Sequence, residues 1–277
     1  LLVFLGLLGT FWGLSGTIGS ISGVIQSLDA GGDTNDVLAA VKSEAVHYEY
    51  DGTKLTGYLY YDDALKEKRP GVMVVHEWWG LNDYAKKRAE MLAELGYVAF
   101  AADMYGDGKV TDKPGQAKEW MTETTADVEA WRGTAKAGLE QLKKSDKVDG
   151  GKLAAIGYCF GGGTILQLAY SGADIKGVVS FHGALPSAPE GSEIKAKILA
   201  FHGNADAMVQ TPTVNKFTEQ LEKTKADWQL VTYGSGVHHG FTNPEAGKYG
   251  IENLKYDEAA DKRSWAGMQM FFTEIFK

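Results

Sequence analysis

The sequence predicts an α/β fold in which a mostly parallel, doubly wound β-sheet is covered by flanking helices. Short apolar runs alternate along the chain with amphipathic segments, which is the pattern of repeated strand–helix units. Several of these runs are apolar throughout, as expected of parallel strands that are buried on both faces. One run leads through the tight turn Gly157-Tyr158-Cys159-Phe160-Gly161 directly into a helix-like segment. Ligands of such a sheet bind beyond the carboxyl ends of its strands.

The expected elements follow in order from local signals. Residues 45–50 and 55–61 alternate in polarity around Asp51-Gly52, which predicts an antiparallel hairpin at the start of the sheet. Strand-like runs then predict strands at 71–76, 97–101, 153–156, 177–181, 198–201 and 228–233. Helical periodicity predicts helices at 83–95, 113–122, 127–144, 162–170, 213–225 and 256–276. The aperiodic segments 183–193 and 240–255 are expected to form loops at the rim of the site.

The Gly-x-Cys-x-Gly turn places Cys159 where a nucleophile is expected. A strand-to-helix turn this tight is crowded, so glycine is needed on both sides of the cysteine. The sulfur would stand at a helix N-terminus, where backbone N–H groups and the helix dipole favour the reactive thiolate. The alternative is that Cys159 is a small buried apolar residue, as single cysteines often are.

An acid and a histidine follow the cysteine in the order that a nucleophile elbow requires. Asp206 lies just past the strand 198–201, and His238 and His239 follow the strand 228–233. In such a triad the nucleophile attacks an acyl carbon, the imidazole transfers the proton, and the carboxylate fixes the imidazole tautomer. On this pattern alone, either histidine could fill the role. Other histidines at strand ends are expected to pack or hydrogen-bond at the sheet rim, and no metal-ligand spacing links them: His76, His182 and His202.

Glu77 is a further candidate because it ends the apolar run 72–76 beside Trp78 and Trp79. A carboxylate next to two aromatic rings loses solvation, which raises its pKa and allows it to exchange a proton with a neighbouring thiol. The alternative is a helix-capping or surface carboxylate.

These motifs resemble the dienelactone hydrolase family of α/β-hydrolases over about residues 46–276. The resemblance is carried by the segments 74–82 and 102–106, by the cysteine turn, by Asp206, and by His239-Gly240-Phe241. It implies an α/β-hydrolase fold and the hydrolysis of ester or lactone bonds, without a cofactor, through a thioester acyl-enzyme. The family's histidine precedes a phenylalanine by two residues, which selects His239 over His238.

The resemblance also implies roles for residues around the triad. The oxyanion would be held by the backbone N–H groups of Phe160 and Trp78, and Glu77 would take part in converting the thiol to the thiolate. Aromatic side chains are expected to shape the substrate pocket: Trp79, Tyr105 and Phe241.

The chain departs from the family where the carboxylate of dienelactone is held. The two arginines that hold it would fall near Asp107 and Asn243, and neither position has one. Lys109 could supply only a point charge, without bidentate geometry. A neutral ester or lactone therefore suits this tryptophan-rich site better than a carboxylated lactone.

Composition narrows the remaining possibilities. The formal net charge is −8 and the basic residues are scattered, which disfavours nucleic acid as a partner. The single cysteine excludes an intrachain disulfide and leaves the redox compartment open. Residues 44–277 are long enough for one catalytic domain with a large core.

The N-terminal segment suggests a membrane anchor. Residues 1–28 carry no charge and exceed the ~20 residues that span a bilayer, and small residues recur every three or four positions. The stretch 5–13 resembles a transmembrane helix of the MotA/TolQ/ExbB proton-channel family, whereas a secretory signal peptide is the alternative. We therefore expect an apolar helix at 1–28, a linker at 29–43, and membrane association. Without that segment the protein would be soluble, cytoplasmic or periplasmic.

Two other classes of function remain open from the sequence. The domain could be a non-catalytic binding module on the same fold, or the accessory part of a membrane complex.

Overall fold

A computed structural model of the protein describes residues 41–277. The predicted apolar helix at 1–28, and the linker up to residue 40, lie outside the described residues. The first strand begins at Val41, so residues 41–43 belong to the sheet and not to the linker. Among the helices of residues 41–277, none has the length and hydropathy needed to cross a bilayer.

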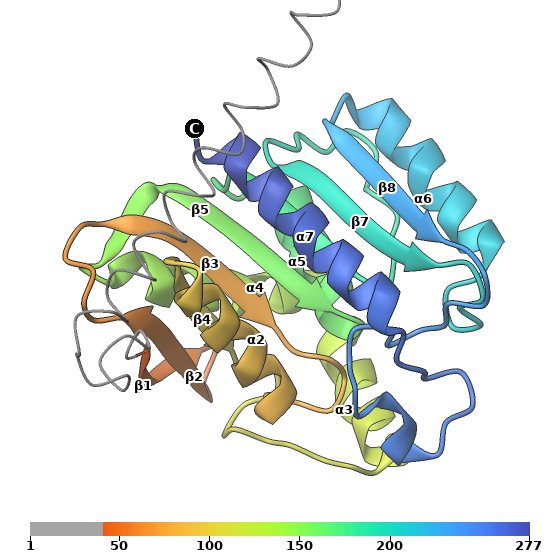
Figure 1. The fold of residues 1–277 in the computed structure, drawn as a ribbon, viewed down its shortest axis with the longest axis horizontal. Coiled ribbons are helices and arrows are strands. Elements are labelled where there is room, and N and C mark those ends of the chain that lie inside the picture. Colours follow the sequence, from red (N-terminus) through yellow and green to blue (C-terminus); the bar gives the residue numbers. More distant parts are fainter. Residues whose placement is uncertain (1–40) are drawn as a thin grey trace, which may run out of the picture. The chain divides into compact units, whose positions relative to one another are not determined.

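The sheet has eight strands in the order β1-β2-β4-β3-β5-β6-β7-β8 (Figure 1). Strands β1 and β2 form an antiparallel hairpin, β2 pairs antiparallel with β4, and all other neighbours are parallel. This topology confirms the predicted mostly parallel sheet with its entry hairpin. The strands are β1 (Val41–Tyr50), β2 (Thr53–Asp62), β3 (Arg69–Val75), β4 (Val98–Ala102), β5 (Val148–Tyr158), β6 (Gly177–Phe181), β7 (Lys197–Gly203) and β8 (Trp228–Tyr233).

Helices cover both faces of the sheet, as a doubly wound arrangement requires. Helices α2 and α7 lie on one face and are drawn in front of the sheet in Figure 1, whereas α4, α5 and α6 pack on the other face. The helices are α2 (Asp83–Glu94), α3 (Pro114–Ala126), α4 (Val128–Lys144), α5 (Phe160–Tyr170), α6 (Thr211–Thr224) and α7 (Glu258–Ile275), with a 3₁₀ helix η1 (Ala246–Tyr249).

Alternation along the strands divides the core into two layers. In β3, Val72 and Val74 face α2 and α7, whereas Met73 and Val75 face α4 and α5. All four side chains are fully buried, which explains why this strand has a continuous apolar sequence.

The ends of the elements are set by polar residues. The side chains of Asn82, Asp127 and Asp257 accept hydrogen bonds from the first-turn N–H groups of α2, α4 and α7. Strand β5 begins at Val148, five residues before the predicted start, because Asp149, Gly150, Gly151 and Lys152 carry no apolar signal.

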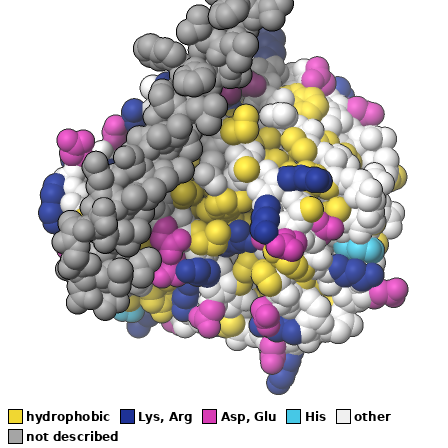
Figure 2. All heavy atoms as spheres, viewed as in Figure 1, with side chains coloured by type: hydrophobic (Ala, Val, Ile, Leu, Met, Phe, Trp, Pro, Cys, Tyr) yellow, Lys and Arg dark blue, Asp and Glu magenta, His cyan; other side chains and the backbone are white. Residues whose placement is uncertain are grey.

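Charges are mixed over the face that carries α2 and α7. Figure 2 shows Lys and Arg side chains interspersed with Asp and Glu on this face, without a basic stripe.

Candidate active site

Cys159 occupies the sharp turn between β5 and α5. Its backbone has φ 53° and ψ −115°, a conformation that residues with a side chain rarely adopt. The N–H of Cys159 donates to Phe181 O at 3.1 Å, and its carbonyl accepts from Ala184 N at 3.1 Å. Hydrogen bonds from the neighbouring strand and loop therefore hold this strained residue in place.

Glycines surround the cysteine because other residues do not fit. A Cβ at Gly157 would collide with the backbone of Gly161, and a Cβ at Gly161 would collide with the carbonyl of Val75. The second contact joins the turn to the end of β3. The glycines thus bring the cysteine against the loop that begins at His76.

His239 and Asp206 form a buried pair. His239 Nδ1 lies 2.7 Å from Asp206 Oδ2, and the other carboxylate oxygen accepts from the backbone N–H groups of Met208 and Val209 at 2.8 and 2.9 Å. Since the ionised carboxylate can only accept, Nδ1 carries the proton. The other ring nitrogen, Nε2, is buried, and Cys159 is near enough to the imidazole to raise its pKa. The structure therefore joins His239, and not His238, to Asp206.

Asp206 and His239 each stabilise the charged form of the other. Burial opposes the imidazolium, but the charge of Cys159 and the hydrogen bond to Asp206 outweigh it and raise the pKa of His239 well above its usual value. Burial likewise opposes ionisation of Asp206, but the hydrogen bond to His239 and the backbone N–H groups lower the pKa of that carboxyl. Both shifts favour a charged imidazolium beside the charged carboxylate of Asp206.

Glu77 is buried next to the pair, at 4% exposure. Its Oε2 accepts a hydrogen bond from Asn243 Nδ2 at 2.8 Å. Burial raises the pKa of Glu77, although the Asn243 hydrogen bond and the positive charges of His239, Arg88 and Lys248 oppose the rise. A raised pKa is also what the sequence predicts for a carboxylate beside Trp78 and Trp79.

The two backbone N–H groups expected to hold an oxyanion flank the site. Trp78 follows Glu77 in the loop after β3, and Phe160 follows Cys159. Within residues 41–277, neither N–H donates to a loop, turn or cap acceptor. Tyr105 OH donates to the carbonyl of Trp78 at 3.1 Å.

All three predicted pocket residues are buried, with Tyr105 at 7% exposure. Phe241 is fully buried and packs edge-on against His182 and Tyr233, and its place in the substrate pocket stays a prediction. Trp79 is 1% exposed beneath Tyr249, whose ring stacks on it at 3.7 Å. An aromatic residue in a loop has no sequence signal that separates a pocket wall from loop packing.

Residues that the sequence did not suggest connect the site to the helices. Thr242 Oγ1 lies 2.7 Å from His182 Nε2 and also contacts Tyr84 OH. Arg88 of α2 donates to the carbonyl of Thr242 and to Asp261 of α7. The sequence predicted that residues 240–255 form a loop at the rim of the site, but no signal pointed to Thr242 within it or to Arg88 on α2.

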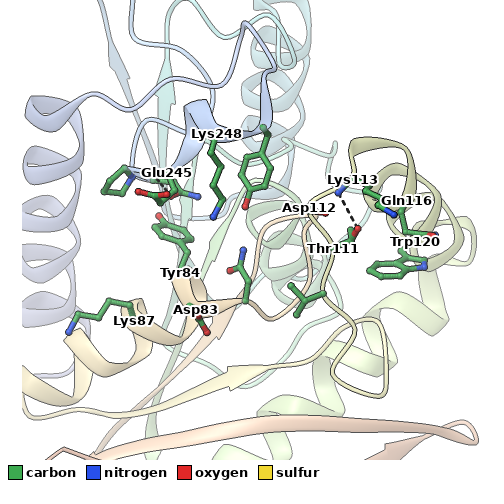
Figure 3. A pocket seen from close by; sticks show the side chains of 15 residues that line it. Asp83, Tyr84, Lys87, Thr111, Asp112, Lys113, Gln116, Trp120, Glu245 and Lys248 are labelled. Carbon is green, nitrogen blue, oxygen red and sulfur yellow. Dashed lines mark hydrogen bonds between the residues drawn. The ribbon is translucent and has the colours of Figure 1, made fainter.

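A cavity of about 920 Å³ adjoins the site (Figure 3). Asn243, which contacts Glu77, and Tyr249, which stacks on Trp79, both line it. Lys248 extends into it from η1. The ionisable side chains of its lining are three lysines and three carboxylates, whose formal charges cancel: Lys87, Lys113, Lys248, Asp83, Asp112 and Glu245. No group of three His, Cys, Asp or Glu side chains within residues 41–277 could hold a metal ion.

A parallel sheet with a cysteine elbow after β5, an acid after β7 and a histidine after β8 defines an α/β-hydrolase fold. The chain belongs to the dienelactone hydrolase family, whose model matches residues 55–276. It is therefore a hydrolase that acts on ester or lactone bonds.

The chain matches several individual relatives over almost their whole length. "Protein usf" of Aquifex pyrophilus is 30% identical over 238 residues, which is 83% of this chain and 98% of that protein. A "Putative carboxymethylenebutenolidase" of Aquifex aeolicus is 30% identical over 84% of this chain and 99% of its own. A crystal structure of a dienelactone hydrolase-like promiscuous phosphotriesterase from metagenomic libraries is 40% identical and has a TM-score of 0.83, covering 86% of this chain and 100% of that one. These comparisons lend no support to the resemblance with the MotA/TolQ/ExbB family.

Proposed function

We propose that the protein hydrolyses neutral esters or lactones through Cys159, His239 and Asp206, by way of a thioester acyl-enzyme. The observation that carries this proposal is the His239 Nδ1–Asp206 Oδ2 contact of 2.7 Å, which occupies one ring nitrogen, while the neighbouring Cys159 helps to raise the pKa of the same imidazole. Nε2 is the atom that must exchange a proton with the nucleophile and the leaving group.

The first half of the reaction forms the acyl-enzyme. The Cys159 thiolate attacks the carbonyl carbon, and the resulting oxyanion is stabilised by the N–H groups of Phe160 and Trp78. When this intermediate collapses, the C–O bond breaks and the alkoxide takes a proton from the His239 imidazolium. A thioester and an alcohol result; from a lactone, the alcohol stays attached to the acyl group.

The second half releases the acid. His239 Nε2 accepts a proton from water, which attacks the thioester carbonyl and forms a second oxyanion. Collapse breaks the C–S bond, and the carboxylic acid leaves while the thiolate and imidazolium are restored. Glu77 is assigned the exchange of a proton with the thiol form of Cys159, supported by its burial and its raised pKa.

Charge supports a neutral substrate. The position where the family would have a carboxylate-binding arginine is occupied by Asn243, whose amide hydrogen-bonds to Glu77. The charges that line the neighbouring cavity cancel. Steady-state kinetics on a neutral lactone and on its carboxylated counterpart will test this, and a higher kcat/KM for the carboxylated lactone contradicts it.

Replacement of the nucleophile tests the mechanism. Cys159→Ala should lower kcat on a short-chain ester by about 1,000-fold or more, because the covalent route is removed. Mass spectrometry of the wild-type protein, quenched during turnover, should find one acyl group on Cys159. Retention of full esterase activity by Cys159→Ala would refute the assignment.

Phosphotriester hydrolysis is a second candidate activity, because a structure that is 40% identical is described as a promiscuous phosphotriesterase. A phosphotriester in the same substrate panel tests it, with Cys159→Ala as the control for the shared nucleophile.

Membrane association through residues 1–28 stays a prediction. Comparing the membrane and soluble fractions of cells that express the full chain will test it.

A further inference from the structure

His76 is fully buried at the end of β3, and both of its ring nitrogens contact backbone groups. The N–H of Met104 donates to Nε2 at 3.2 Å, and since an amide N–H can only donate, Nε2 must be unprotonated. The proton of the neutral ring is then on Nδ1, which donates to the carbonyl oxygen of Glu77 at 2.5 Å. Burial lowers the pKa of His76, which keeps the ring in this neutral form.

The hydrogen bond to Glu77 controls the direction of the next N–H. The carbonyl of Glu77 and the N–H of Trp78 belong to one planar peptide group, and within residues 41–277 no peptide bond is cis. In a trans peptide the C=O and N–H point to opposite sides. The N–H of Gly80 also donates to this carbonyl, at a longer distance of 3.3 Å. His76, at 2.5 Å, is the closer of the two donors, and by holding the carbonyl it helps to set the direction in which the Trp78 N–H points.

Tyr105 holds the following peptide group. Its hydroxyl donates to the carbonyl of Trp78 at 3.1 Å, and its ring packs edge-on against His76 with centroids 5.0 Å apart. Burial raises the pKa of Tyr105, so the hydroxyl keeps its proton and remains a donor. The backbone of Tyr105 is itself fixed, because its N–H donates to Asp103 Oδ1 at 3.0 Å. The carbonyls on both sides of Trp78 are thus tied to side chains that cannot easily move.

We propose that His76 and Tyr105 are positioning residues that aim the backbone N–H of Trp78 at the oxyanion. The inference rests on the proposed function, in which that N–H stabilises the tetrahedral intermediates. Neither side chain touches the substrate in this scheme. His76 restrains the peptide group between Glu77 and Trp78, and Tyr105 restrains the next one, between Trp78 and Trp79. Together they limit rotation of the backbone on both sides of Trp78.

Comparing the rates of acylation and alkylation of Cys159 distinguishes a misdirected Trp78 N–H from general damage to the site. Acylation of Cys159 by an activated ester passes through an oxyanion, whereas alkylation of the same thiolate by iodoacetamide does not. Loss of an oxyanion donor costs about 100–1,000-fold in rate, so a donor that is present but poorly aimed should cost roughly 10–100-fold. Tyr105→Phe should therefore slow acylation by that factor and leave alkylation within about twofold of wild type, because the thiolate is untouched.

Variants of His76 add a rescue test. His76→Phe removes both ring nitrogens and should slow acylation at least as much as Tyr105→Phe. His76→Asn can place its amide near the position of Nδ1, donate to the Glu77 carbonyl, and recover part of the rate. Tyr170→Phe is the matched control, because Tyr170 is a buried tyrosine whose hydroxyl donates to the carbonyl of Pro186 at 3.0 Å. It should change neither rate.

The outcomes distinguish this inference from the proposed function. If Cys159→Ala abolishes hydrolysis but Tyr105→Phe and His76→Phe acylate at the wild-type rate, the inference fails and the proposed function stands. Equal slowing of acylation and alkylation in Tyr105→Phe also overturns it, because the defect would then lie in the thiolate. If ester hydrolysis does not depend on Cys159, both fail.

Discussion

Glu77 and His239 show how burial and neighbouring charge compete at single residues. Burial disfavours the charged form of each, yet only Glu77 shifts in the direction that burial dictates. The difference lies in their partners. His239 has an anionic carboxylate and a sulfur beside it, whereas the hydrogen-bond partner of Glu77 is the neutral amide of Asn243. Burial of a weakly compensated carboxylate costs stability when it ionises.

The raised pKa of Glu77 predicts a pH-dependent loss of stability. Because the folded-state pKa lies above the unfolded value, no loss arises below the unfolded value, near 4.5. As the pH rises from there to the folded-state pKa, the unfolded chain ionises first and stability declines by about 1.4 kcal/mol per pH unit. Glu77→Gln cannot ionise, so its stability advantage over wild type should grow across this window. Urea unfolding between pH 4 and 8 measures it.

Glu140→Gln serves as the control, since Glu140 is exposed on α4. Its stability relative to wild type should not change with pH. An advantage of Glu77→Gln that shrinks as the pH rises would contradict the assigned direction.

Asp206 should set the pH range of activity through His239. Its negative charge and hydrogen bond help to raise the pKa of His239, so Asp206→Asn should lower that pKa and shift the alkaline limb of kcat/KM to lower pH. The rate at the optimum should fall by about 100–10,000-fold, because the imidazole tautomer is no longer fixed. A full pH–rate profile measures both effects.

Asp227→Asn is a suitable comparison. Asp227 pairs with Lys197 at 2.8 Å just before β8, at the amino ends of the strands. Its profile should match that of wild type. An unshifted alkaline limb in Asp206→Asn would argue against the proposed proton transfer.

At the scale of elements, the turn after β5 depends on its glycines. A Cβ at Gly161 would meet the carbonyl oxygens of Val75 and His76, which are backbone atoms and cannot move aside cheaply. We expect Gly161→Ala to destabilise the protein by about 1–3 kcal/mol through overpacking. It should also lower activity, because the N–H groups proposed to hold the oxyanion, those of Trp78 and Phe160, lie just past the ends of β3 and β5, which would be forced apart. Thermal unfolding and acylation kinetics measure the two effects.

Gly115 provides the matched glycine. It lies in the first turn of α3, and a Cβ there would meet nothing within 4 Å. Gly115→Ala should therefore be neutral or slightly stabilising, since alanine is the better helix former. If Gly161→Ala and Gly115→Ala change stability and activity equally, crowding at the turn does not explain the loss in Gly161→Ala.

The strands also show which sequence signals are sufficient to predict the bounds of an element. Strand β6 was predicted with its observed bounds, because a run that is apolar on both faces has few alternatives. The first residues of β5 were missed because Asp149, Gly150, Gly151 and Lys152 carry no apolar signal. The packing of Phe241 could not be predicted because its neighbours in the core, His182 and Tyr233, come from other parts of the chain.

At the scale of the whole molecule, chain order and sheet topology predict the edge of the sheet at which the site is expected. They do not predict the side-chain contacts between its residues. Parallel strands bring their carboxyl ends to one edge, so an elbow, an acid and a histidine after successive strands are expected to meet there. The contact between Asn243 and Glu77 joins residues 166 positions apart through two polar side chains. No periodicity or motif encodes such a pair, and only the folded chain brings the two together.

Arg88 connects helices α2 and α7 to the loop that contains Thr242. It is buried on α2, lies 2.7 Å from Asp261 Oδ1 on α7, and donates to the carbonyl of Thr242 in the loop between His239 and Asn243. Its removal would leave a partly buried carboxylate and a buried carbonyl without their partner, so Arg88→Ala should destabilise the protein by about 3–5 kcal/mol. The midpoint of thermal unfolding should then fall by roughly 6–20 °C.

The exposed pair of Lys262 and Glu258 on α7 is the contrasting case, because solvent screens both charges. Lys262→Ala should leave the unfolding midpoint unchanged within error. A single guanidinium nitrogen, Nη2, donates to both Thr242 O and Asp261 Oδ1. Arg88→Lys keeps the charge but replaces the planar guanidinium by a compact ammonium group, so it should recover only part of the stability. If Arg88→Ala unfolds at the temperature of Lys262→Ala, Arg88 does not couple the helices to the loop. The position of His239 must then be set by β8 and Asp206 alone.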